Sequence, residues 1–126
     1  MKLQALEGDF TVCQVEDFSR VDWQSLCFTA RTDREWSLLC RTDKAPSNTT
    51  AREDGWRALR VAGTLDFSLT GILSKLATVL ADAGVGIFAV STYDTDYILV
   101  KAENLDRATA ALNKAGYALQ GIPAEL

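Results

Sequence analysis

With 126 residues, the chain is long enough for one domain with a real core or for two very small domains. Hydrophobic residues make up 48% of the chain. The net charge is −4 and the basic residues are scattered, which excludes a basic surface that follows a phosphate backbone, so we expect no nucleic-acid partner. No apolar run approaches the roughly 20 residues that cross a bilayer, and the amino terminus lacks a secretory signal, so we expect a cytoplasmic protein without a membrane partner.

The first half of the chain favours strands. Residues 10–15 alternate apolar and polar side chains, which predicts a half-buried strand. Residues 26–30 and 36–40 are apolar runs on either side of a polar turn at 32–35, so we expect a hairpin there. Residues 17–24 are compatible with either a helical turn or a loop anchored by aromatic side chains.

After the hairpin the composition changes. Residues 41–55 are rich in polar and turn-forming residues, and this stretch predicts a linker. A brief polar helix over 47–54 is the alternative. The linker would separate a shortened N-terminal unit, residues 1–55, from a complete unit, residues 56–126.

The second half contains an amphipathic helix over 69–83. Its apolar side chains recur at steps of three and four, and so they share one face of a 3.6-residue helix: Leu69, Ile72, Leu73, Leu76, Leu80 and Ala83. Ser68 and Thr70 can accept hydrogen bonds from first-turn amides, and Gly84 suits the left-handed turn that ends a helix.

The remaining segments complete a βαββαβ order. Residues 87–90 form an apolar run that predicts a strand apolar on both faces, and a short turn at 93–96 joins it to a second strand at 97–100. A second helix over 105–115 follows, between Asn104 as cap and Gly116 as stop. Strands at 56–61 and 117–119 open and close the unit. We therefore expect an α+β fold of antiparallel sheets with helices on one face, built as a diverged internal duplication.

Residue types that usually carry catalysis are missing or scattered. The sequence has no histidine, which removes the usual general base near neutral pH and every Ser-His or Cys-His pair. Gly84 and Gly86 follow an expected helix, whereas a phosphate-binding glycine loop follows a strand. We therefore expect no enzyme, no catalytic residues and no cofactor.

A metal site is not expected either. Cys13, Cys27 and Cys40 are odd in number, lie in apolar settings and form no CxxC motif, which fits reduced buried thiols. The Asp-Thr-Asp spacing at 94–96 invites a calcium site, but the loop lacks the glycine and the terminal glutamate of an EF-hand.

Two segments carry a family resemblance: DFSLTGI at 66–72 and STYDTDYILV at 91–100. In them the chain resembles the ACT-domain superfamily of amino-acid-binding regulatory modules, whose fold is a ferredoxin-like βαββαβ unit. It is similar in particular to small bacterial tandem ACT-like proteins, which are related to the regulatory part of lysine-sensitive aspartate kinases and to cytosolic arginine sensors. The resemblance covers residues 56–119 closely and the first half in pattern only.

The resemblance implies where a ligand would bind. In ACT modules a free amino acid commonly lies near the start of the first helix, beside the neighbouring strand and often between two modules. Carried onto this sequence, the implied ligand-binding residues are Asp66, Phe67, Ser68, Gly71, Ile72, Leu73, Ser91, Thr92, Tyr93 and Asp96.

The chemistry of these residues suits a zwitterion. Unpaired amides of Gly71, Ile72 and Leu73 would favour an α-carboxylate, and Asp66, Asp94 or Asp96 would pair with the ammonium group. A structural role is the alternative, because helix caps and turn aspartates are common without any ligand.

We therefore expect a regulatory module that binds a small amino acid or a related metabolite and forms a homodimer. The alternative is a ligand-free interaction or structural dimer that keeps the ACT fold. The sequence leaves open which amino acid binds and whether the pocket lies within one chain or between subunits.

Overall fold

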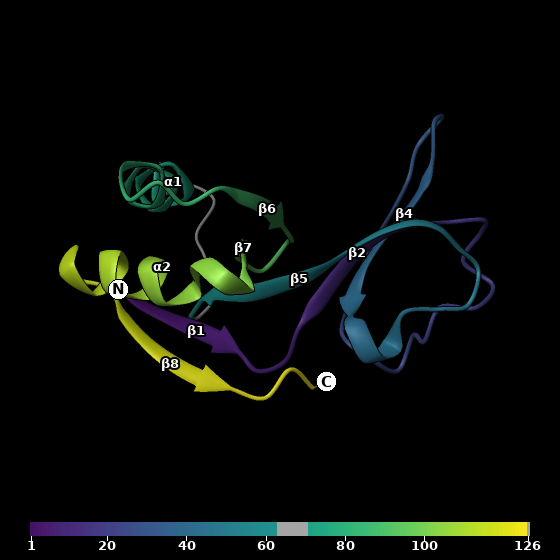
Figure 1. The fold of residues 1–126 in the computed structure, drawn as a ribbon, viewed down its shortest axis with the longest axis horizontal. Coiled ribbons are helices and arrows are strands. Elements are labelled where there is room, and N and C mark those ends of the chain that lie inside the picture. The colour runs from purple at the N-terminus through teal and green to yellow at the C-terminus, as the bar shows by residue number, and fades with distance from the viewer. Residues whose placement is uncertain (63–70, 126) are drawn as a thin grey trace. The chain divides into compact units, whose positions relative to one another are not determined.

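The computed structural model describes residues 1–62 and 71–125 (Figure 1). The chain forms two compact units. The helical unit comprises Met1–Glu7 and Arg57–Ile122, and the strand unit comprises Gly8–Trp56 and Pro123–Leu126. The amino-terminal strand thus lies in the unit that we expected to begin at residue 56.

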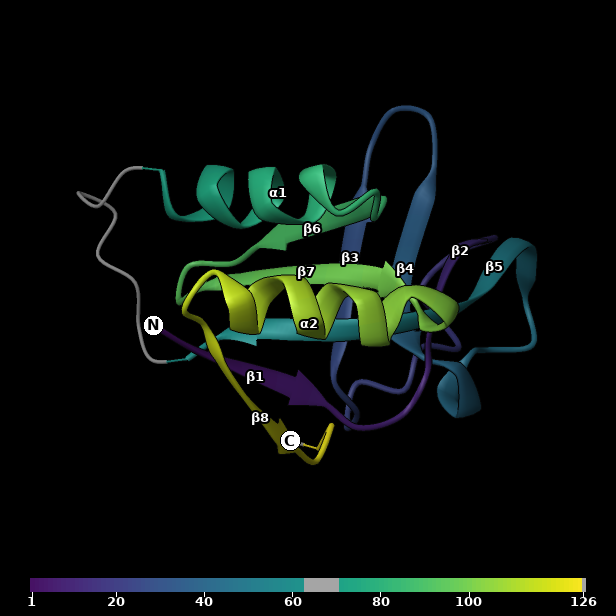
Figure 2. The ribbon, with the colours of Figure 1, turned by 60° about the vertical axis from the view of Figure 1, so that its left-hand side comes forward.

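The part of the helical unit beyond residue 56 has the expected βαββαβ order. Its elements beyond residue 56 are the second half of β5 (Thr49–Val61), α1 (Ile72–Asp82), β6 (Ile87–Ser91), β7 (Asp96–Lys101), a 3-10 turn η2 (Ala102–Asn104), α2 (Leu105–Lys114) and β8 (Ala118–Ile122). Both helices lie over the same face of the sheet (Figures 1 and 2). The α+β class and the helices on one face are confirmed.

The sheet of this unit differs from the expectation in one strand. The chain begins with β1 (Lys2–Leu6), which inserts between β5 and β8 and gives the order β6-β7-β5-β1-β8. β1 is antiparallel to β5 but parallel to β8, so the sheet is mixed rather than wholly antiparallel. The strand was missed because its two buried residues, Leu3 and Leu6, are three positions apart and do not alternate.

The core of the helical unit joins both helices to the sheet. The residues of this cluster are less than a tenth exposed: Leu3, Leu59, Val61, Leu76, Leu80, Val85, Ile98, Val100, Ala108 and Leu112. On β5 and β7 they alternate along the strand and therefore project from one face. Burial of this apolar surface is the main stabilising contribution to the unit.

The first helix ends as predicted but begins later. Gly84 has a φ of +75°, its amide donates to the Ala81 carbonyl at 2.9 Å, and the Val85 amide donates to the Leu80 carbonyl at 2.9 Å. These two bonds satisfy the last carbonyls of the helix and form a Schellman motif. At the other end α1 starts at Ile72; the predicted caps Ser68 and Thr70 lie outside the described residues.

The strand unit is a four-stranded sheet. Its order is β3 (Cys27–Arg31), β4 (Trp36–Arg41), β2 (Phe10–Val15) and the first half of β5. The predicted strand at 10–15 and the predicted hairpin are confirmed. Residues 17–24 form an irregular loop, in which the Phe18 ring meets the rings of Trp23 and Trp36 edge-on at 6.1 and 4.9 Å. The aromatic-anchored loop is therefore the correct alternative.

The prediction of a linker over 41–55, with its helical alternative, is wrong. A short 3-10 turn, η1 (Thr42–Lys44), leads into β5, which begins at Thr49 and pairs antiparallel with β2. This part of β5 is almost entirely exposed, so strand pairing rather than apolar burial holds it in place. A polar strand of this kind has no hydrophobic alternation by which to recognise it.

Two sets of elements repeat along the chain. β6, β7 and η2 each begin 60 residues after β3, β4 and η1, namely Cys27 to Ile87, Trp36 to Asp96 and Thr42 to Ala102. Each element has as many residues as its counterpart. After η2 the chain enters α2, whereas after η1 it proceeds into β5.

No helix in the described part of the chain is long and apolar enough to cross a membrane.

We predict that Leu80→Ala lowers the free energy of unfolding by about 3 kcal/mol, because Leu80 is 0% exposed and its removal leaves a cavity. Leu73→Ala on the same helix is the matched control, since Leu73 is only partly buried, and we expect a loss of about 1 kcal/mol. Urea denaturation followed by circular dichroism measures both. Equal losses would show that the core is not centred on the buried stripe of α1.

Candidate functional site

Three chain segments converge at one end of the helical unit. α1 has 11 residues and so is about 16 Å long, and the five residues of β6 also span about 16 Å. Because only a short turn joins the end of α1 to the start of β6, the start of α1 lies at the same end as the β6–β7 turn. Figure 2 shows this arrangement.

A buried hydrogen bond adds the end of β5 to this group. Thr95 is 4% exposed, and its hydroxyl donates to the carbonyl of Val61, the last residue of β5, at 3.0 Å. The bond fixes the β6–β7 turn against β5. The loop from β5 to α1 therefore starts beside this turn.

Three hydrogen bonds between Thr92 and Thr95 close the turn, one of them from the Thr92 hydroxyl to the Thr95 carbonyl at 3.1 Å. The Thr92 amide donates to the Thr95 carbonyl at 2.9 Å, and the Thr95 amide donates to the Thr92 hydroxyl at 3.2 Å. Since hydrogen-bonded and non-hydrogen-bonded pairs alternate in an antiparallel ladder, the next pair, Ser91 and Asp96, is of the second kind, with close side chains.

This pair brings together two of the predicted site residues. The Ser91 hydroxyl donates to Asp96 Oδ1 at 2.6 Å, which fixes the carboxylate at the start of β7. A carboxylate accepts several hydrogen bonds, so the bond to Ser91 leaves capacity for an ammonium group. Asp96 is half-buried, and its contact with Ser91 is exposed to solvent.

The other predicted residues occupy different positions. Gly71 lies just before α1 with a φ of +78°, a backbone conformation that favours glycine. Ile72 and Leu73 begin the helix, and their side chains pack against the core. Tyr93 is 88% exposed at the tip of the hairpin, so its ring is not part of a preformed wall. Asp66, Phe67 and Ser68 lie outside the described residues.

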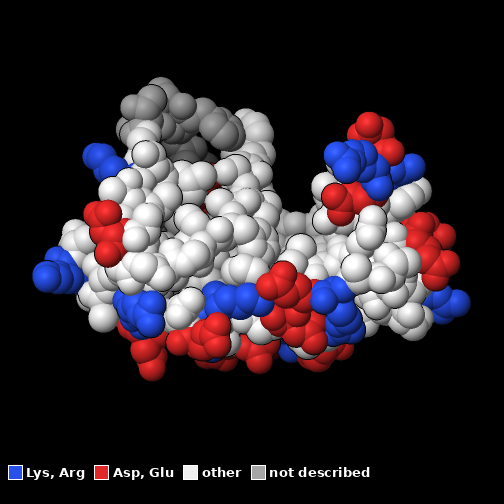
Figure 3. Space-filling view, turned by 45° about the horizontal axis from the view of Figure 1, so that its top comes forward, with Lys and Arg blue, Asp and Glu red and all other residues white. Residues whose placement is uncertain are grey.

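On the face shown in Figure 3, basic and acidic side chains are interspersed. Among the described residues, no group of three or more Cys, Asp or Glu side chains is placed to hold a metal ion. The sequence reasoning missed Thr95, although a β-branched residue with a hydroxyl directly before a strand was a usable signal.

Comparison with known proteins identifies the family. The sequence profile of the ACT domain matches residues 51–114. The chain belongs to the ACT-domain family. A solved structure, protein Atu0741 from Agrobacterium tumefaciens, is 30% identical to this ACT-domain protein over 96% of this chain and 92% of its own, with a TM-score of 0.82.

More distant structures share the fold. VC0802 from Vibrio cholerae, described as a protein of unknown function and possible transport protein, is 20% identical over 90% of this chain and 88% of its own, with a TM-score of 0.70. The regulatory subunit of aspartate kinase from Thermus thermophilus is 10% identical over 90% of this chain and 96% of its own, with a TM-score of 0.62. The predicted resemblance of this ACT-domain protein to aspartate kinase regulatory regions is thus confirmed at the level of fold.

We predict that Thr95→Val destabilises the protein by about 1 to 2 kcal/mol, because it removes the buried hydrogen bond to the Val61 carbonyl while keeping the side-chain shape. Thr78→Val is the control: its hydroxyl bonds the Ser74 carbonyl on the exposed face of α1, and we expect a change within about 0.5 kcal/mol. Chemical denaturation measures both variants. A neutral Thr95→Val would mean that the turn is not held to β5 by this bond.

Proposed function

We propose that this ACT-domain protein is a non-catalytic regulatory sensor that binds a free α-amino acid or a related metabolite at this end of the helical unit. The observation that carries the proposal is the convergence of the first turn of α1 with the Ser91–Asp96 pair. One element supplies amides for an anion and the other supplies a fixed carboxylate for a cation. A free α-amino acid has an ammonium group and a carboxylate group attached to the same carbon atom.

The α-carboxylate of the ligand would bind at the start of α1. The first-turn amides of a helix, here those of Ile72 and Leu73, have no acceptor within the helix, and the helix dipole adds a partial positive charge. A Cβ atom added to Gly71 would meet no atom of the described residues within 4 Å.

The α-ammonium group would bind at the hairpin. Asp96 supplies the negative charge, Ser91 orients it, and Thr92 supplies the neighbouring polar surface. A charge-assisted contact of this kind is stronger than a neutral hydrogen bond. We further propose that Asp66, Phe67 and Ser68, which the family resemblance implicates, contribute to the same site.

The regulatory role is supported by the fold, which is that of aspartate kinase regulatory regions. The non-catalytic part of the proposal is supported by the lack of histidine in the sequence, because histidine is the usual general base near neutral pH. Binding that changes the packing of two ACT modules would be the output, and it requires no cofactor.

We also propose that the strand unit is a shortened ACT-like repeat of the helical unit. The 60-residue offset of three consecutive elements supports this origin. The two hairpin turns share their bonds as well: Thr32 and Thr92 donate their amides to Glu35 and Thr95, and their hydroxyls accept the amides of the same two residues.

A thermal-shift screen of the twenty amino acids at millimolar concentration, followed by calorimetry, tests the sensor proposal. A ligand selective for the folded state raises the apparent stability by mass action. For the ligand found, we expect Asp96→Asn to weaken binding by about tenfold or more, because it removes the charge opposite the ammonium group.

Asp94→Asn is the matched control, because it removes the same charge two residues away on the exposed part of the turn, and it should leave affinity nearly unchanged. Equal effects of the two variants would indicate a general electrostatic contribution rather than a site at Asp96. If no amino acid stabilises the protein, the sensor proposal fails.

A second candidate function, a homodimeric interaction module, is favoured by β6. Among the described residues β6 pairs with β7 alone, and its sequence IFAVS has no charge. We expected this strand to be apolar on both faces; in the structure Ala89 is exposed, and Ile87 and Val90 are half-buried. An uncharged edge strand of this kind can pair with a second copy of the chain.

We predict that Ala89→Lys shifts a dimer toward monomer in sedimentation velocity, because a lysine on an edge strand opposes pairing with another edge. Ala81→Lys, at an exposed position of α1, adds the same charge away from the edge and should leave the dimer intact. A wild-type monomer at micromolar concentration would contradict the dimer. A stable dimer whose Tm and sedimentation do not change with any amino acid would favour the interaction module over the sensor.

A further inference from the structure

The three cysteines of the strand unit lie on one face of its sheet. Cys27 on β3 is the direct cross-strand neighbour of Cys40 on β4, and Cys13 lies on β2, the next strand. We propose that Cys27 and Cys40 are a redox-sensitive pair that a hydroperoxide converts into a cross-strand disulfide. This modification site is independent of the amino-acid site proposed above.

The strand register places the Cα atoms of these two cysteines at a separation that a disulfide can span. At the β3–β4 turn the Thr32 amide donates to the Glu35 carbonyl at 3.0 Å, which makes these residues a hydrogen-bonded pair. The register continues without a bulge to Cys27 opposite Cys40, five pairs further on. Because the two kinds of pair alternate, Cys27 and Cys40 form a non-hydrogen-bonded pair, whose Cα atoms lie about 4.5 Å apart. Disulfides span about 4.4 to 6.8 Å between Cα atoms.

The same register excludes a disulfide from Cys13 to Cys40 and one from Cys13 to Cys27. Cys40 faces Thr11 across the β2–β4 pair, and Cys13 faces Leu38, so Cys13 and Cys40 are diagonal neighbours about 7 to 8 Å apart. Cys13 and Cys27 are separated by the whole of β4, which is about 9.5 Å at two strand spacings. A single pairing is therefore available without movement of the backbone.

The two thiols differ in access. Cys27 is half-buried on β3, which pairs with β4 alone in the part of the chain that the structure describes, whereas Cys40 is 2% exposed. An oxidant in solution therefore meets Cys27 first. Cys40 lies beside it on β4 as the residue that can close the disulfide.

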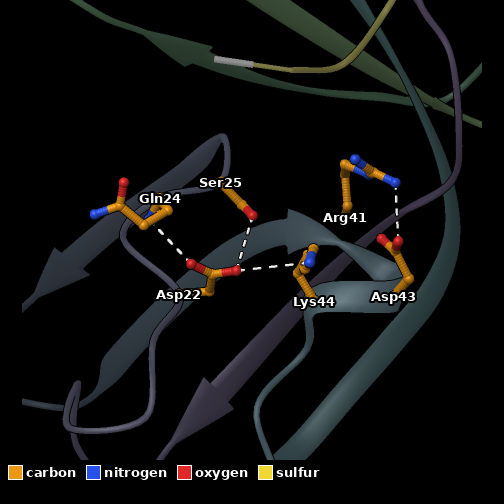
Figure 4. A network of polar contacts seen from close by, with 6 residues as sticks. All are labelled: Asp22, Gln24, Ser25, Arg41, Asp43 and Lys44. Carbon is orange, nitrogen blue, oxygen red and sulfur yellow. Dashed lines mark hydrogen bonds and ion pairs between the residues drawn. The ribbon is translucent and has the colours of Figure 1, made fainter.

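The surroundings keep both thiols protonated and so slow the reaction. Burial raises the pKa of Cys27, and the negative charge of Asp22 raises it further. Figure 4 shows the Asp22 carboxylate held by the Gln24 amide, the Ser25 hydroxyl and the Lys44 ammonium group. Burial raises the pKa of Cys40 to about 12. Since the thiolate is the reactive form, we expect the disulfide to form slowly, during prolonged exposure to the hydroperoxide.

The chemistry balances with one hydroperoxide. The Cys27 thiolate attacks an oxygen of the peroxide, the O–O bond breaks, and Cys27 becomes a sulfenic acid while an alcohol, or water from hydrogen peroxide, leaves. The Cys40 sulfur then loses its proton and attacks the Cys27 sulfur, and the S–O bond breaks with release of water. Two thiols are oxidised by two electrons and the peroxide is reduced by two.

The test treats the full-length folded protein with excess hydrogen peroxide, alkylates the remaining thiols and maps tryptic peptides without reduction. Cleavage after Arg20, Arg31 and Arg34 places the three cysteines on separate peptides. We expect one new linked species that joins the Cys27 and Cys40 peptides, lighter by two hydrogens and reversed by dithiothreitol. The oxidised protein should also have a higher Tm, because the bridge restricts the unfolded chain.

Two variants complete the test. Cys13→Ser should still form the bridge, whereas Cys27→Ser, at a half-exposed position that tolerates the change, should not. The proposal is overturned if the wild type keeps three alkylatable thiols, if Cys27 proceeds to sulfinic acid without a linked peptide, or if the bridge involves Cys13 or a second chain. Mapping of the wild type needs no variant and decides the pairing by itself.

Discussion

The hydrogen bond between the buried Thr95 hydroxyl and the Val61 carbonyl is the contact on which the site depends. It closes a short hairpin against the end of β5, at the point where the chain departs for α1. Leaving the Val61 carbonyl buried and unpaired would cost about 1 to 3 kcal/mol of stability, which favours the turn position in which Thr95 reaches this carbonyl. With the turn fixed, the Ser91–Asp96 pair follows from ladder alternation.

The start of α1 comes to the same place for a different reason. A helix of 11 residues and a strand of five have nearly the same length, and the Schellman turn at Gly84 reverses the chain between them. The described part of the helical unit therefore has the first-turn amides of α1 and the Asp96 carboxylate at one end. This geometry suits a ligand with two opposite charges and leaves the rest of the unit for packing.

The sequence predicted the helical unit well because the apolar residues of α1 follow the 3.6-residue helical period, and the strands at 87–90 and 97–100 are short continuous apolar runs. It failed where pairing rather than burial decides: β1 has no alternation, and the polar half of β5 looked like a linker. For the site, residue types pointed to Ser91 and Asp96, but only the register shows that they touch. The same alternation rule pairs Cys27 with Cys40, which spacing along the chain does not show.

The most direct test of the central claim is a titration of the ¹⁵N-labelled protein with the stabilising amino acid, followed by amide chemical shifts. The account predicts that the largest changes fall on two separate segments, the amides of Gly71 to Leu73 and those of residues 91–96, and that they saturate with one dissociation constant. Changes confined to the strand unit, or to one of the two segments alone, would contradict it.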